Sequence, residues 1–264
     1  MTARSATTTG PTLRRAGPIA LGSLIVVVVL ATVAPIALGV PVEAPLAIGS
    51  KVVLCALAVV LLSANGWWRR AGFLALPARA DLVWLGPPTL LIMGVLAAVV
   101  VAGPVPVEAS LIVAFVVVAL GTGFSEEALF RGVLVESIRP WGPLRAIVGS
   151  TAAFSAIHFA GLLAGATLEA TIVQVVLGGI PFGLAFAGLR LTTRSIWPLV
   201  ALHAVNNVSA YLMSGQWQAT TAEAGRFGVA ATLQLGLLVL LVAYGVWFLW
   251  HFSRSQRVAP LGEP

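Results

Sequence analysis

Two adjacent acids, Glu126 and Glu127, stand in an otherwise apolar stretch of the sequence and have the residue type needed for proton transfer. Arg131 follows Glu127 by four residues, so the two side chains share one face of a helix and the guanidinium group can neutralise that carboxylate. Glu126 is rotated by about 100° around the helix and lacks this partner. We therefore predict that Glu126 acts on water as a general base and that Glu127 and Arg131 form an ion pair, which can also serve to lock helix packing.

Two histidines also lie in apolar segments, His158 in FSAIHFA and His203 in LHAVNN. Phe154 precedes His158 by four residues and gives it an aromatic neighbour on the same helix face. Asn207 follows His203 by four residues and can offer an amide donor beside the imidazole. Ionisable groups inside a membrane are costly and mark functional sites, so we expect these side chains to converge in one cavity.

These residues fit two mechanisms of hydrolysis. In the first, Glu126 and His158 activate water, and His203 with Asn207 donates hydrogen bonds to the oxyanion of a tetrahedral intermediate. In the second, Glu126, His158 and His203 ligate a divalent metal ion such as zinc, which leaves a position open for water. The sequence contains neither HExxH nor GxSxG, so the common zincin arrangement and the nucleophile elbow are excluded.

The elements that carry these residues are apolar helices. Hydrophobic residues make up 59% of the 264-residue chain and charged residues 9%, against roughly 25% charged in soluble domains. Runs of about 20 apolar residues match the thickness of a bilayer. We expect an all-α, polytopic bundle of about eight transmembrane helices, at residues 18–40, 45–63, 82–102, 109–137, 143–164, 168–190, 195–214 and 227–252.

The positions of the basic residues predict which side of the membrane each connector and each terminus faces. If alternate connectors lie on one side of the membrane, Lys51 and Arg226 fall on the opposite side from the other connector arginines. That larger set comprises Arg4, Arg14, Arg15, Arg69, Arg70, Arg79, Arg139, Arg145, Arg190, Arg194, Arg254 and Arg257. Since positive charge is retained in the cytoplasm, both termini are expected there.

The same arginines serve as reference points for how deep each candidate site residue lies in the bilayer. Counted from the adjoining arginine, Glu126 and His158 are 13 residues into their helices and His203 is nine. At about 1.5 Å per residue, all three lie roughly 14–20 Å into the bilayer. Groups at one depth on three helices can meet around one cavity.

We expect one transmembrane domain at residues 16–252, with its motif-bearing core at 109–214, between disordered cytoplasmic tails at 1–15 and 253–264. The net charge of +6 is spread over short connectors, so no nucleic-acid partner is expected. The expected location is the cell (plasma) membrane, as a multi-pass protein. Arginine, alanine, glycine and valine are abundant, which indicates a GC-rich bacterial genome.

The segments EEALFR, FSAIH and HAVNN resemble the EExxxR, FxxxH and HxxxN motifs of the type II CAAX-prenyl endopeptidase family. Bacterial members of that family are often labelled CPBP intramembrane metalloproteases. The resemblance implies that Glu126 is the water-activating base, that His158 is its partner, and that His203 and Asn207 are oxyanion donors. It also implies that Glu127 and Arg131 hold the site together. Both a metal ion and a metal-free glutamate mechanism are consistent with the family.

We therefore expect an intramembrane endopeptidase that hydrolyses a bond in a membrane-associated or hydrophobic protein or peptide, a CAAX-type substrate included. The expected partners are this substrate and the lipid bilayer. Two other functions are weighed against it. One is a proton-coupled transporter, since buried acids and histidines also build proton relays. The other is a membrane scaffold or immunity protein in which catalysis is dispensable.

Overall fold

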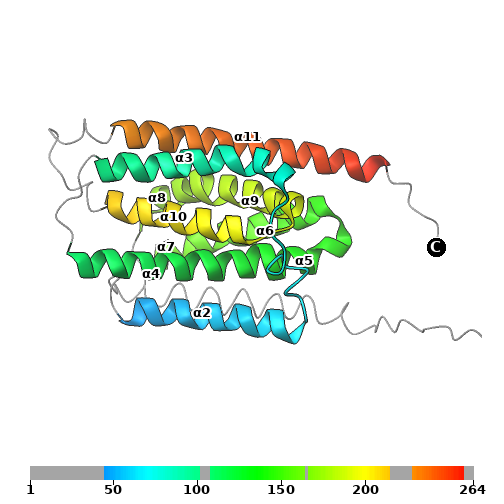
Figure 1. Cartoon of the computed structure of the whole chain (residues 1–264), viewed down its shortest axis with the longest axis horizontal. Helices are drawn as coiled ribbons and strands as arrows, with labels where there is room; N and C mark the ends of the chain where they lie inside the picture. Colours follow the sequence, from blue (N-terminus) through cyan, green and yellow to red (C-terminus); the bar gives the residue numbers. More distant parts are fainter. Residues whose placement is uncertain (1–44, 102–107, 164–165, 215–227, 259–264) are drawn as a thin grey trace, which may run out of the picture.

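The computed structural model describes residues 45–101, 108–163, 166–214 and 228–258, and within these ranges every regular element is a helix. The long helices run side by side as a bundle (Figure 1). This agrees with the all-α expectation. The predicted helix 18–40 and the predicted tail 1–15 lie outside the described residues.

The longer elements of the bundle are, in chain order, α2 (Pro45–Ala64), α3 (Leu82–Val101), α4 (Ala109–Glu126), α6 (Pro143–Ala156), α9 (Ile180–Thr193), α10 (Trp197–Ser214) and α11 (Gly228–Val258). Between them lie shorter pieces, namely α5 (Val135–Ile138), α7 (Ala160–Leu163) and α8 (Leu168–Val173). Two π-helical segments, Glu127–Leu134 and Gln174–Gly179, join α4 to α5 and α8 to α9. A 3-10 turn at Ile157–Phe159 joins α6 to α7.

These elements match the other seven predicted ranges closely, because the bilayer sets the length of an apolar run. The main difference is at the C-terminal end, where α11 continues to Val258 although a tail was expected from residue 253. Arg254 lies on this extension with its guanidinium group 4.2 Å from the centre of the Trp250 ring. The aromatic contact gives that charge a partner on the helix itself.

Four helical runs of the described chain are long and apolar enough to cross a membrane: Arg79–Val101, Ala109–Trp141, Leu168–Thr193 and Gly228–Arg254. A shorter apolar helix spans Ile48–Ala64. The chain is therefore a multi-pass membrane protein. The total of eight spans and the cytoplasmic termini stay predictions.

Glycines allow some of the helices to pack closely against one another. In the packing of α4 against α10, a Cβ at Gly123 would lie 2.8 Å from the carbonyl oxygen of Val200. In the packing of α9 against α11, a Cβ at Gly188 would overlap the Phe248 ring. Small residues at such points let backbones approach closely, which is how helices associate in lipid.

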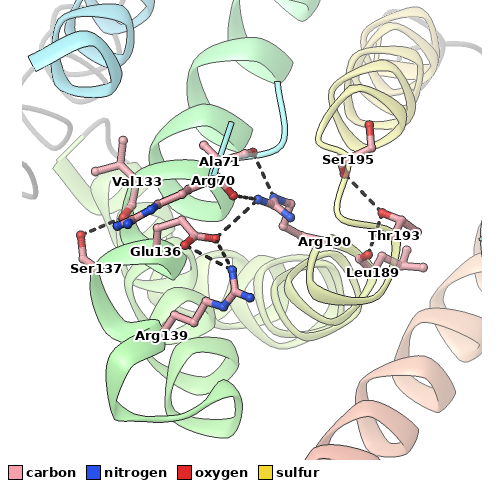
Figure 2. A network of polar contacts seen from close by, with 10 residues as sticks. All are labelled: Arg70, Ala71, Val133, Glu136, Ser137, Arg139, Leu189, Arg190, Thr193 and Ser195. Carbon is pink, nitrogen blue, oxygen red and sulfur yellow. Dashed lines mark hydrogen bonds and ion pairs between the residues drawn. The ribbon is translucent and has the colours of Figure 1, made fainter. Parts of the chain in front are cut away.

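A cluster of charged side chains formed by Glu136, Arg139 and Arg190 lies where α5 and α9 end (Figure 2). Arg190 donates from Nε to the Ala71 carbonyl oxygen at 3.1 Å and also to the Arg70 carbonyl oxygen. Its NH2 group lies 3.5 Å from Glu136 Oε1, and the same carboxylate pairs with Arg139 at 3.1 Å. We had expected Arg190 in a connector, but it lies in α9 and is 2% exposed because these carbonyl and carboxylate oxygens replace its water.

The connector between α2 and α3 is also fixed to the start of α10. Ile196 N donates to the Gly72 carbonyl oxygen at 3.3 Å, and Trp197 Nε1 donates to that of Phe73 at 3.0 Å. Gly72 has a φ of 83°, which favours glycine, and a Cβ there would lie 2.6 Å from the Arg194 carbonyl oxygen. These contacts bring connectors expected on the cytoplasmic side together at one end of the bundle.

Candidate active site

His203 lies between the two adjacent acids. Its Nδ1 is 2.8 Å from Glu127 Oε1, and its Nε2 is 3.7 Å from Glu126 Oε2. An ionised carboxylate can only accept, so Nδ1 carries the proton of the short contact. This orients the ring and turns Nε2 toward Glu126. Glu126 was expected to lack Arg131 as a partner and to lie near the site histidines, and His203 of α10 does lie beside it.

Glu127 is fully buried and is shared by two partners. The predicted ion pair is present, since Arg131 NH1 lies 3.2 Å from Glu127 Oε1, the oxygen that His203 also contacts. Arg131 is also fully buried; its NH2 group donates to the Phe182 carbonyl oxygen at 3.3 Å. Its guanidinium carbon lies 4.1 Å from the centre of the Phe154 ring. Glu127 and Arg131 therefore form a rigid base for the imidazole, as a buried charge must be paired to be tolerated.

A change of helix type occurs at the two acids. Glu126 is the last residue of α4, and the π-helical segment begins at Glu127. A π-helical turn is wider than an α-helical one and often occurs at functional sites. Here it lies where two consecutive carboxylates contact different nitrogens of one imidazole.

Aromatic rings surround His203. The ring centres of Phe154, Phe182 and Phe186 lie 6.1, 6.5 and 6.4 Å from that of His203. Phe154 was predicted as a site residue from its spacing to His158, whereas Phe182 and Phe186 on α9 were not. Their spacing of four residues in PFGLAF places them on one helix face and was the available signal. The rings limit the access of water to the charged groups.

His158 also packs against Phe154. It lies in the 3-10 turn after α6 and is half-buried, with its ring centre 5.1 Å from that of Phe154. Its Nδ1–H donates to the Phe154 carbonyl oxygen at 2.9 Å, which leaves Nε2 as the free acceptor of the neutral ring. Phe154 thus contacts both site histidines.

Asn207 lies one turn after His203 on α10 and is half-buried. Its position on the helix is the one that the spacing predicted. The structure thus groups Glu126, Glu127, Arg131 and His203 directly, with Asn207 next to them along α10.

The described ranges contain no group of three histidine, cysteine, aspartate or glutamate side chains that could hold a metal ion. Glu126, His158 and His203 as placed do not fit a three-ligand site, although His203 Nε2 and Glu126 Oε2 face each other.

The chain is thus a multi-pass membrane protein in which carboxylates and an imidazole are buried together among the helices. Residues 108–209 match the family model of the type II CAAX prenyl endopeptidases, Rce1-like, and this range includes every predicted site residue. This segment, which is less than half of the chain, is similar to that family of membrane-embedded proteases. No curated protein and no solved structure matches the chain.

Proposed function

We propose that the chain is an intramembrane endopeptidase in which Glu126 activates a water molecule that attacks a peptide bond. The observation that supports it most directly is the separation of 3.7 Å between Glu126 Oε2 and His203 Nε2. This separation is longer than a direct hydrogen bond and suits two groups that share one water or substrate oxygen.

The proton transfers balance without another co-reactant. Glu126 takes a proton from water, and the hydroxide oxygen bonds to the carbonyl carbon, whose oxygen becomes an oxyanion. The protonated Glu126 then gives this proton to the leaving nitrogen as the carbon–nitrogen bond breaks. The products are a carboxylic acid and an amine, and the Glu126 carboxylate is restored.

The oxyanion is stabilised by His203 and Asn207. Because Nδ1–H of His203 donates to Glu127, the ring donates to the reacting oxygen from Nε2 in its doubly protonated form, and it keeps both protons throughout the reaction. The Asn207 amide, one turn away, adds a neutral donor. Removing one donor of this kind typically costs roughly 10²–10³ in rate.

His158 is the proposed partner of Glu126 in orienting water. Its Nδ1–H is held by the Phe154 carbonyl oxygen, so the neutral ring offers Nε2 as an acceptor for a water proton. A divalent ion bound to Glu126, His158 and His203 is a separate proposal, which would require these side chains to move together.

The proposed substrate is a membrane-associated or hydrophobic protein or peptide. Glu126 and His203 are 8% and 6% exposed, among apolar helices whose outer surface faces lipid. A peptide therefore reaches them from within or along the bilayer, and a hydrophobic segment or lipid anchor brings it there. CAAX-type peptides are the first class to test, and the proposed location is the cell membrane of a bacterium.

The test is cleavage by the purified protein in liposomes of two quenched fluorescent peptides, one farnesylated and of CAAX type, the other apolar and unprenylated. The wild type and Glu108→Gln, a change at an exposed position, should cleave at least one, and Glu126→Gln should cleave neither. Full activity of Glu126→Gln would overturn the proposal. Solute flux that depends on Glu126 without cleavage would indicate a transporter. Biological protection or complex assembly that survives Glu126→Gln would indicate a scaffold.

A further inference from the structure

The connectors at one end of the bundle carry a surplus of positive charge. Residues 65–78, 135–142 and 189–197 contain five arginines and a single carboxylate, that of Glu136. We call these arginines the arginine cluster: Arg69, Arg70, Arg139, Arg190 and Arg194. One carboxylate cannot neutralise five guanidinium groups, so this end of the bundle attracts anions.

The buried members of this region hold the exposed ones in place. The Glu136 side chain is 6% exposed and lies 3.1 Å from Arg139 and 3.5 Å from Arg190 (Figure 2). Arg190 also donates to the carbonyl oxygen of Arg70, which ties the α2–α3 connector to the end of α9. Arg70 and Arg139 therefore project from backbone that is already fixed, and such preorganisation lowers the entropy lost when a ligand binds.

Arg139 has donors that Glu136 does not use. Both hydrogen bonds between the two side chains come from NH1 of Arg139, at 3.1 and 3.4 Å. Its side chain is 55% exposed, so Nε and NH2 can donate to a ligand in the headgroup region. A guanidinium group with two parallel donors suits two oxygens of one phosphate. Arg70 and Arg194 are exposed as well.

The ends of the apolar runs place the arginine cluster at the surface of the membrane. Two runs that are long enough to cross the bilayer, Ala109–Trp141 and Leu168–Thr193, end beside it. Trp141 and Trp197 are 55% and 44% exposed there, and tryptophan favours the level of the lipid headgroups. The anion present at that level is the phosphate of the lipid itself.

We propose that the arginine cluster binds the phosphate of an anionic phospholipid, with Arg139 and Arg70 as the main donors and Arg194 beside them. An anionic lipid is favoured over a zwitterionic one, because the ammonium group of the latter is repelled by the surplus positive charge. The bound lipid links the α2–α3 connector to the turn after α5. This inference does not depend on the proposed peptidase function.

The test is native mass spectrometry of the full-length protein with added phosphatidylglycerol or phosphatidylcholine. The wild type should bind phosphatidylglycerol more tightly than phosphatidylcholine. Arg139→Gln and Arg70→Gln should each weaken the binding of phosphatidylglycerol roughly fivefold and leave that of phosphatidylcholine unchanged. The matched control is Arg254→Gln, which removes the same charge from an exposed arginine of α11 and should change the affinity less than about twofold.

An equal loss of affinity in Arg254→Gln would overturn the inference, because binding would then follow net charge and not this site. Unchanged affinity in both Arg139→Gln and Arg70→Gln would also overturn it. Inorganic phosphate added at constant ionic strength should leave the lipid bound. Its displacement would identify a soluble anion as the occupant and contradict the assignment to a lipid.

Thermal unfolding in lipid-free detergent checks that the variants fold. Arg139→Gln should unfold near the wild-type temperature, because its ion pair with Glu136 is exposed. If Arg139→Gln does not fold, Arg70→Gln alone decides. The contact of Arg70 with Arg190 uses the Arg70 backbone carbonyl, which this change leaves in place.

Discussion

Glu127 holds His203 by a contact of 2.8 Å between Oε1 and Nδ1, although 76 positions separate the two residues in the chain. The same oxygen pairs with Arg131 at 3.2 Å. Glu127 therefore orients the imidazole, and Nε2 is left to face Glu126. The two adjacent carboxylates thus have different surroundings: Glu127 is held by His203 and Arg131, whereas Glu126 faces Nε2, where proton transfer is proposed.

Glu127→Gln should lower both activity and stability. The neutral amide keeps the shape of the side chain but leaves Arg131 as an unpaired buried charge, which costs roughly 3–5 kcal/mol in such pairs. Thermal unfolding in detergent and peptide cleavage should both report the loss. Glu127→Gln combined with Arg131→Met should recover stability without recovering activity, since the amide oxygen that His203 then contacts carries no negative charge. Wild-type turnover in either variant would contradict the assigned role.

Asn207→Ala should reduce kcat by roughly 10²–10³ with little change in the unfolding temperature, because the amide is proposed to act on the oxyanion. The matched control is Asn206→Ala. That residue is also a half-buried asparagine of α10 but is rotated by about 100° from the site face. Equal effects of the two changes on kcat would show that the amide of Asn207 has no special role.

Arg190→Met should destabilise the end of the bundle at which the α2–α3 connector is held. The change removes the donors to Ala71 and Arg70 and weakens the support of Glu136, so the expected cost is roughly 3–5 kcal/mol. Faster proteolysis within residues 65–78 would report release of the connector. Arg139→Met is the control, because that side chain is 55% exposed and its pairing with Glu136 is worth roughly 1 kcal/mol or less. A connector that stays protected in Arg190→Met would refute this role.

Gly123→Ala should reduce activity by moving α4 away from α10. The added Cβ would lie 2.8 Å from the Val200 carbonyl oxygen, so the helices must separate slightly three residues before Glu126. Misplacement of a catalytic group by about 1 Å can cost roughly 10² in rate. Gly49→Ala is the control, because a Cβ there meets nothing within 4 Å. Normal cleavage by Gly123→Ala would show that the site tolerates this separation.

Chelation tests the metal proposal. If the carboxylate and imidazoles act alone, prolonged dialysis against a strong chelator should leave peptide cleavage unchanged, and metal analysis should find less than one ion per chain. Loss of activity that zinc restores would instead show that Glu126, His158 and His203 move into a ligand set. Restoration should then fail in His158→Ala.

The helices were predictable from the sequence because an apolar run that crosses the bilayer must match its thickness. The helices α2, α3 and α10 begin and end within a few residues of their predicted bounds. The ion pair of Glu127 and Arg131 was predictable for a similar reason, since helical spacing alone brings them together.

The remaining features depend on contacts between distant segments. The π-helical segment at Glu127–Leu134 leaves no distinct pattern in eight apolar-rich residues, so a regular helix was expected there. The contact of Glu127 with His203 and the burial of Arg190 against Ala71 need the packed bundle. Sequence spacing describes one helix face at a time and cannot identify partners across helices.

A double-mutant cycle on peptide cleavage tests whether Glu126 and His203 act on the same water or substrate oxygen. We predict that Glu126→Gln and His203→Gln each lower kcat/KM by roughly 10³ or more and that the double variant is no slower than the slower single variant. Losses that multiply in the double variant would show that the two side chains act independently, and wild-type turnover by Glu126→Gln would contradict the account altogether.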